Sequence, residues 1–253
     1  MKLTPALALC AALAAPALAQ TQSDAGAPTA MTEAERQDFR AEVRAYLLEN
    51  PEVLMEAIAI LEDRQAAAEE ANDAALVEAN RAAIFDDPAS WSGGNPQGDI
   101  TVVEFMDYRC GYCRKAFEEV EALVKSDGKI RFVVKEFPIL GEASDTSSRF
   151  AIATLQLAGP DAYKRAHDAL VTLRGDVTPA ALDRLAGDLG LDAAAIRARM
   201  IAPEVTAVIA QNRALAEALK INGTPTFVID GVMLRGYVPL DGMRQIVEEA
   251  RRG

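Results

Sequence analysis

The cysteine pair in Cys110-Gly111-Tyr112-Cys113 is the feature that most restricts how this chain can fold. An apolar run, residues 100–106, precedes the pair, and a helical pattern, residues 114–124, follows it. At such a strand-to-helix turn, cysteines two residues apart can close a disulfide over the first helical turn. Unpaired backbone N–H groups and the helix dipole stabilise a thiolate there. We therefore predict that Cys110 is the attacking thiol and Cys113 the resolving thiol of a redox centre.

Other uses of the pair fit the sequence less well. A zinc site needs four ligands, but the chain supplies these two cysteines, Cys10 and one distant histidine, His167. Haem attachment requires a histidine after the second cysteine, where Arg114 stands. A structural disulfide stabilises a fold by closing a long loop, which this pair does not do. We expect no metal and no other cofactor, and we interpret His167 as an ordinary packed or surface residue.

Residues 1–19 have the pattern of a cleaved secretory signal, which predicts a periplasmic protein of a bacterium. Lys2 is followed by a short apolar stretch, and Ala17-Leu18-Ala19 is a suitable cleavage site. Cleavage would remove Cys10 and leave the Cys110 and Cys113 pair in a compartment where disulfides persist. The net charge of −12 argues against nucleic acid or an anionic membrane surface as a partner.

Residues 20–32 are rich in small residues and proline and are expected to be flexible, whereas residues 33–84 have the pattern of a helical leader. Thr32 and Glu35 fit a capping box, and Asn50-Pro51 interrupts the helix. The leader has a narrow apolar edge, which is buried most economically between copies of the chain. We therefore predict a homo-oligomer formed through residues 33–84. The alternative is that residues 39–61 pack against the rest of the chain as ordinary core.

The remaining sequence predicts an α/β catalytic domain. Residues 85–98 contain many Pro and Gly residues, which predicts a linker, and the domain is expected to occupy residues 99–253. Residues 100–106 and 130–137 predict neighbouring parallel strands joined through the catalytic helix. Helical patterns fill an insertion at about residues 142–220. A β-hairpin with its turn at Asp230-Gly231 and a closing helix follow.

Two residues outside the cysteine pair are candidates for the chemistry. Glu104 interrupts a strand that otherwise has the pattern of one buried on both faces, where burial would raise its pKa. Beneath the cysteines it could exchange a proton with them, and the alternative is an edge or strand-end glutamate paired with Lys135. Pro225 is expected to form a cis bond with Thr224 that faces Cys110. The main chain of Thr224 could then hydrogen-bond an extended substrate segment.

The C-G-Y-C helix, the helical insertion and Gly223-Thr224-Pro225-Thr226-Phe227 together resemble the DsbA-like branch of the thioredoxin superfamily, from about Asp99 onward. The resemblance implies a thioredoxin fold with an inserted helical domain. It also implies Cys110 as attacking thiol, Cys113 as resolving thiol, Pro225 as cis-proline and Glu104 as buried acid.

Two details depart from the strong oxidase of that family and look more like disulfide isomerases of the DsbC kind. Gly111 and Tyr112 replace its Pro-His dipeptide, and Thr224 replaces the Val before the cis-proline. We expect Gly111, Tyr112 and Thr224 to contact the substrate. Without a histidine between the cysteines, the Cys110 thiolate has one fewer favourable neighbour. We predict a Cys110 pKa below that of a free thiol but above that of the strongest oxidases, and a less oxidising couple.

Residues 46–53, Tyr-Leu-Leu-Glu-Asn-Pro-Glu-Val, resemble the helical leader of ScsC-like proteins, which are thiol proteins associated with copper tolerance. Such leaders can assemble into trimers, so the resemblance implies an oligomeric isomerase or reductase. Its substrates would be unfolded or wrongly disulfide-bonded secreted proteins, and a membrane partner would reduce or oxidise the active site. Two alternatives stay open: a monomeric DsbA-like dithiol oxidase, and a Cu(I)-binding protein that uses the same two cysteines.

Overall fold

A computed structural model describes residues 31–252 of the chain. The predicted signal peptide, with Cys10, and residues 20–30 of the predicted flexible start lie outside the described residues. Of the helices that the structure describes, none is both long and apolar enough to cross a membrane. The chain divides into two compact units between Ile60 and Leu61.

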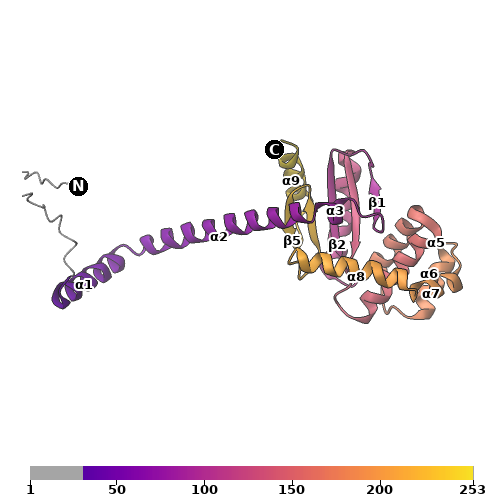
Figure 1. Cartoon of the computed structure of the whole chain (residues 1–253), viewed down its shortest axis with the longest axis horizontal. Helices are drawn as coiled ribbons and strands as arrows, with labels where there is room; N and C mark the ends of the chain where they lie inside the picture. The colour runs from indigo at the N-terminus through magenta and orange to yellow at the C-terminus, as the bar shows by residue number, and fades with distance from the viewer. Residues whose placement is uncertain (1–30, 253) are drawn as a thin grey trace, which may run out of the picture. The chain divides into compact units, whose positions relative to one another are not determined.

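The first unit contains α1, Glu33–Glu49, and the beginning of α2, Glu52–Ala79 (Figure 1). Thr32 caps α1 as predicted, because its hydroxyl accepts the Glu35 N–H at 3.3 Å and the Glu35 carboxylate accepts the Thr32 N–H at 2.8 Å. α1 buries none of its residues. Several large apolar side chains of this unit are therefore exposed in the single chain: Phe39, Val43, Tyr46, Leu48, Leu54, Met55, Ile58 and Ile60.

The second unit is built on a five-stranded sheet in the order β1-β3-β2-β4-β5 (Figure 1). The strands are β1, Trp91–Gly94; β2, Ile100–Met106; β3, Ile130–Glu136; β4, Thr226–Ile229; and β5, Val232–Arg235. β2 and β3 pair in parallel, as predicted, and β4 pairs antiparallel with both β2 and β5. Asp230 adopts φ 54 in the predicted turn, a left-handed conformation suited to a tight hairpin.

Alternation along the central strands divides the core between the two faces of the sheet. On one face, Val102 and Met106 join buried side chains of α4, Gly111–Asp127, and α9, Leu240–Arg252. On the other face, Val103 and Phe105 join side chains of α3, Arg81–Phe85, and α8, Pro203–Ala218. The cysteines lie on the face that α4 covers, because α4 begins directly after Cys110.

The predicted helical insertion lies between β3 and β4 and consists of α5, Glu142–Thr172; α6, Pro179–Asp188; α7, Ala193–Met200; and α8. α5 bends at Gly159, φ 81 and ψ −177, directly before Pro160. Its buried face includes Tyr163 and His167. The structure thus confirms the predicted α/β fold with an inserted helical domain.

The interpretation of residues 85–98 as a linker is wrong for residues 91–94, which form the edge strand β1 antiparallel to β3. Trp91 is buried and stacks on Tyr163 with ring centroids 5.5 Å apart. A Cβ at Gly93 would lie 2.3 Å from the Trp91 ring. That glycine therefore marks a close approach within a strand, which its sequence pattern does not distinguish from a flexible join.

Candidate active site

Cys110 is held at the N-cap of α4 by the turn that follows β2. Its backbone is extended, φ −73 and ψ 121, and its carbonyl accepts the Arg114 N–H at 3.1 Å. The buried Asp107 carboxylate fixes this turn by accepting the backbone N–H groups of Arg109, Ile139 and Leu140. The turn thereby places the Cys110 sulfur beside the unpaired N–H groups of the helix.

The surroundings of Cys110 favour its thiolate. A hydrogen bond from the Cys113 thiol is the main cause that lowers the pKa of Cys110 to about 5. Burial opposes this shift, whereas the Thr224 side chain and the backbone N–H groups of Cys113 and Tyr112 add to it. The protonated Cys110 thiol instead donates to the Thr224 carbonyl at 3.1 Å. The Thr224–Pro225 bond is cis and lies beside Cys110, as predicted.

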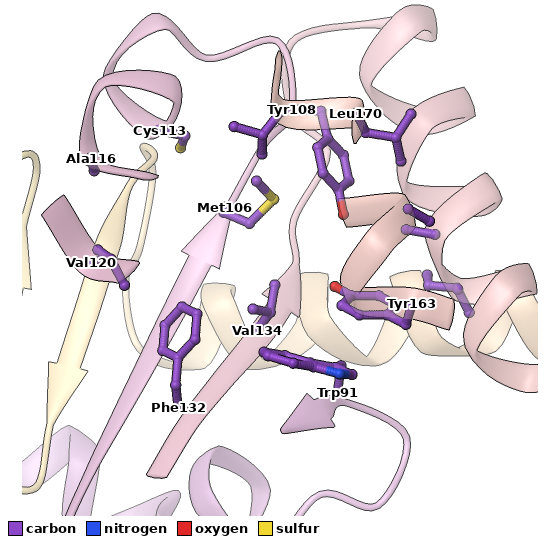
Figure 2. Close-up of a cluster of buried hydrophobic side chains, with 14 of the residues drawn as sticks. Trp91, Met106, Tyr108, Cys113, Ala116, Val120, Phe132, Val134, Tyr163 and Leu170 are labelled. Carbon is purple, nitrogen blue, oxygen red and sulfur yellow. The ribbon is translucent and has the colours of Figure 1, made fainter. Parts of the chain in front are cut away.

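Cys113 is held as a neutral thiol. It is 1 % exposed on the buried face of α4, in a cluster with Met106 and Ala116 (Figure 2). The hydrogen bond to Cys110 is the main cause that raises the pKa of Cys113, followed by burial and by the charge of Glu104. The two sulfurs are therefore unequal: the Cys110 thiol ionises easily, whereas the Cys113 thiol keeps its proton.

Glu104 is 4 % exposed and lines a small pocket together with Cys113. Burial raises the pKa of Glu104 to about 8, and the charges of Cys110, Glu121 and Glu136 add to the effect. The structure therefore places a carboxyl of perturbed pKa in the same pocket as the Cys113 thiol.

The alternative pairing of Glu104 with Lys135 is wrong. Lys135 stands opposite Phe105 in the β2–β3 register, so its side chain leaves the sheet on the face away from Glu104. There the Lys135 ammonium binds the Asp87 carboxylate at 2.6 Å.

Sequence reasoning missed a buried polar cluster beside these groups. Glu136 ends β3, and its Oε1 accepts the hydroxyl protons of Tyr108 at 2.8 Å and Tyr163 at 2.5 Å. The Tyr108 hydroxyl also lies 3.0 Å from Nδ1 of His167, which is buried. Burial raises the pKa of Glu136 to about 7 and lowers that of His167 to about 3. Glu136 could have been recognised from the sequence, because an acid in an otherwise apolar strand is unusual. No pattern in the sequence around His167 indicates its place in this cluster.

An aromatic surface borders the cysteines. Tyr112 is 62 % exposed and stacks with Tyr237 at 6.3 Å between ring centroids. The Lys115 ammonium lies 4.1 Å from the Tyr237 ring centroid, a cation–π contact. A Cβ added at Gly111 would meet no atom within 4 Å. Gly111 and Tyr112 are therefore open to an incoming chain.

The ionisation of Cys110 tests this geometry directly. Thiolate absorbance of the reduced protein, and its rate of alkylation, should both be half-maximal near pH 5, because the thiolate gains hydrogen bonds that an exposed thiol lacks. The Cys110→Ser variant, which retains Cys113 with its raised pKa, serves as the control and should show no step there. A midpoint near the free-thiol value of about 8.5 would contradict the arrangement.

Two protein families match the sequence. The family described as DSBA-like thioredoxin domain matches residues 101–248, more than half of the chain. The Copper resistance protein ScsC N-terminal domain matches residues 35–68. The second match covers most of α1 and the first part of α2, and it includes residues 46–53, which resemble the leader of ScsC-like proteins.

Solved structures with similar folds include the following two. The thioredoxin-like oxidoreductase from Silicibacter pomeroyi DSS-3 is 44 % identical, with 69 % of this chain and 99 % of that chain covered and a TM-score of 0.65. Proteus mirabilis ScsC in a transitional conformation is 26 % identical, with 87 % and 96 % covered and a TM-score of 0.63.

A curated relative, the Na⁺/H⁺ antiporter NhaA 3 of Salinispora tropica, is 29 % identical over 157 residues. That alignment covers 62 % of this chain and 24 % of the antiporter. The chain thus spans about a quarter of the length of the first curated relatives it matches.

Proposed function

Because this chain belongs to the DSBA-like thioredoxin domain family, we propose that it is a thiol–disulfide oxidoreductase that acts on protein disulfides. In its more specific form, we propose a protein disulfide isomerase or reductase of the bacterial periplasm. The observation that carries the proposal is the Cys110 sulfur at the start of α4, with its pKa lowered to about 5 beside the buried Cys113 thiol. The secretory pattern of residues 1–19 supports the compartment.

The reaction begins when the Cys110 thiolate attacks one sulfur of a substrate disulfide. A Cys110–substrate bond forms, the substrate S–S bond breaks, and the other substrate sulfur leaves as a thiolate. In isomerisation, a substrate thiolate attacks elsewhere in the substrate and then releases Cys110 unchanged. In reduction, Cys113 loses its proton and attacks the Cys110 sulfur, which releases a substrate dithiol and leaves the Cys110–Cys113 disulfide. A dithiol partner must then reduce that disulfide.

The substrate would lie along the exposed side of the site. Thr224 places its carbonyl 3.1 Å from the Cys110 sulfur, and Pro225 has no N–H that could compete for a neighbouring acceptor. An extended segment can therefore pair with the main chain of Thr224 as an added strand. Gly111 leaves room for it, and the exposed Tyr112 ring offers it an apolar surface.

The dipeptide between the cysteines supports isomerase or reductase activity over strong oxidation. Gly111 and Tyr112 supply no cationic side chain to the Cys110 thiolate. Less stabilisation of the reduced form makes the couple less oxidising. A membrane protein with a reactive dithiol is the partner that would keep Cys110 reduced. If the mature protein were a monomer that only oxidises reduced ribonuclease, the alternative of a DsbA-like oxidase would replace this proposal.

We propose that residues 33–84 assemble the chain into a homo-oligomer, with a trimer favoured. Within the first unit, α1 and the start of α2 line a hollow of about 400 Å³ whose walls include Phe39, Val43, Leu47 and Leu54. An apolar edge of this kind on a long helix is stabilised when another copy covers it. Several catalytic domains held together could then engage one misfolded substrate, which favours isomerisation.

The proposed assembly through residues 33–84 can be tested by substitution. Val43→Asp places a charge on the apolar edge, where Val43 is 39 % exposed in the single chain, and should convert the oligomer to a monomer because burying the charge is costly. Ala41→Asp, two residues away on the opposite side of α1, is the matched control. Light scattering gives the mass, and reactivation of scrambled ribonuclease gives isomerase activity.

We expect Val43→Asp to lose most of its isomerase activity while its Cys110 thiol reacts normally, and Ala41→Asp to behave like the parent. Unchanged mass in Val43→Asp would show that this edge does not assemble the protein. A monomeric Val43→Asp variant with full isomerase activity would instead separate assembly from function.

A Cu(I)-binding role is the second candidate, because residues 35–68 match the N-terminal domain of a copper resistance protein. Paired soft sulfurs suit Cu(I). However, the buried Cys113 thiol has a raised pKa and would have to ionise to become a good ligand. Among residues 31–252, no group of three or more His, Cys, Asp or Glu side chains gathers as a metal site. The sulfur pair therefore supports thiol exchange better than copper storage.

A further inference from the structure

His167 and the Cys113 thiol line the same small pocket inside the second unit. A cavity with about 10 Å³ open to the centre of a water molecule is lined by Glu104, Cys113, Glu121 and His167, together with apolar side chains. A space of this size accommodates one water when two to four polar groups surround it. The cavity therefore fits a single water in contact with both the resolving thiol and the buried acid.

The hydrogen bonds of Tyr108 determine which nitrogen of His167 is free. The Tyr108 hydroxyl has one proton, and the carboxylate oxygen of Glu136 at 2.8 Å is the acceptor that takes it. The contact of 3.0 Å between the Tyr108 oxygen and His167 Nδ1 is then donated by Nδ1–H. In this assignment, Nε2 has no proton and is the nitrogen left to accept a hydrogen bond.

The groups around His167 keep the imidazole neutral. Three carboxyl groups face this region: Glu104 of β2, Glu136 of β3 and Glu121 of α4. Their negative charges would favour a protonated imidazole, whereas the Lys164 ammonium of α5 disfavours it. The Tyr108 and Tyr163 rings and the Phe117 ring pack against the imidazole. Burial is the main cause that lowers the pKa of His167 to about 3, and Lys164 adds to it. A neutral ring can accept a hydrogen bond over the whole working pH range.

We propose that His167 is a positioning residue for the resolving step, and that its Nε2 holds a water in this cavity through which Cys113 passes its proton to Glu104. The proposal rests on the thiol-exchange function proposed above. In the step, the Cys113 proton moves to the water while the water gives a proton to the Glu104 carboxylate. The Cys113 thiolate then attacks the Cys110 sulfur, the Cys110–Cys113 bond forms, and the substrate sulfur leaves with the electron pair of the broken bond.

The two half-reactions can be separated in one experiment. The reduced full-length protein is mixed rapidly with excess dithiobis(nitrobenzoate), an aromatic disulfide whose released thiolate absorbs visible light. The first nitrobenzoate thiolate leaves when Cys110 attacks the reagent, and the second leaves when Cys113 attacks the Cys110 mixed disulfide. The first phase reports the proposed function, and the second phase reports the role of His167.

His167→Leu should slow the second phase about tenfold, the size of one hydrogen bond's contribution, and leave the first phase unchanged. His167→Gln, whose amide oxygen can accept a hydrogen bond, should restore most of the rate. Tyr108→Phe removes the oxygen bonded to Nδ1 and should slow the second phase several-fold. Tyr163→Phe is the matched control, because it removes the other hydroxyl bonded to Glu136 and leaves His167 Nδ1 bonded.

A second phase of parental rate in His167→Leu would overturn the inference. Equal slowing in His167→Gln and His167→Leu would also overturn it, because packing rather than a nitrogen acceptor would then be responsible. If His167→Leu does not fold, as urea unfolding would show, the Gln, Tyr108→Phe and Tyr163→Phe variants still decide the question. Absence of the first phase in the parent protein would instead refute the proposed thiol exchange and would not bear on His167.

Discussion

Cys110→Ser is expected to reduce disulfide exchange with a model protein substrate to the uncatalysed rate. Hydrogen bonds lower the pKa of Cys110 to about 5 and so stabilise its thiolate. A serine hydroxyl does not ionise near neutral pH, so the variant has no anionic nucleophile at this position. Cys113 cannot substitute for it, because Cys113 is 1 % exposed and its pKa is raised. This is the largest effect expected from any single substitution.

Cys113→Ser is the matched comparison. It keeps the nucleophile but removes the group that releases the substrate, so a Cys110–substrate mixed disulfide should accumulate. That species is measured by mass spectrometry after acid quenching. Reactivation of scrambled ribonuclease should be lost in Cys110→Ser and partly retained in Cys113→Ser, since isomerisation can end by attack of a substrate thiol. Parental exchange in Cys110→Ser would refute the assignment of the nucleophile.

Glu104→Gln is expected to give the second largest effect, a loss of roughly 10²- to 10⁴-fold in the rate at which Cys113 resolves a mixed disulfide. The amide keeps the shape of the side chain and removes the base that takes the Cys113 proton. The rate of the initial attack by Cys110 should fall far less, because the Cys110 thiolate is already formed at neutral pH. Glu118→Gln is the control, because this substitution removes the same charge from a residue that is exposed on α4.

The same substitution should change stability in a pH-dependent way. The pKa of Glu104 is raised from 4.5 to about 8 in the folded state, so the folded protein binds more protons than the unfolded chain between those values. Its free energy of unfolding therefore falls as pH rises from about 4.5 to 8. Glu104→Gln should escape this loss and become more stable than the parent by roughly 3 to 5 kcal/mol above pH 8. Urea unfolding at pH 5 and pH 9 measures the difference, and equal differences at both values would contradict the burial of an ionising carboxyl.

The sequence predicted the parts of the protein whose signals are local. The spacing of Cys110 and Cys113 within a strand-to-helix pattern located this cysteine pair at the start of α4, and the Thr32 and Glu35 pair located the start of α1. The apolar runs predicted β2 and β3 as parallel neighbours. Each of these features depends on residues close together in the chain, where backbone sterics and capping hydrogen bonds act directly.

Local patterns failed where a distant partner decides the outcome. Gly93 is in a strand because the Trp91 ring occupies the space over it, and Trp91 is fixed by Tyr163 of α5. A composition rich in Pro and Gly does not distinguish that close packing from a flexible linker. The same is true of Glu104 and Lys135, whose charges suggested a pair until the strand register placed them on opposite faces.

The sequence alone thus located the cysteine pair at the start of a helix and predicted the α/β fold. Only the tertiary structure decided what surrounds the resolving thiol, because Glu104 of β2, Cys113 of α4 and His167 of α5 meet at one cavity from three separate elements. Burial at this pocket shifts the pKa of each group. Burial depends on how distant elements pack together, so the spacing of residues within one segment cannot predict it.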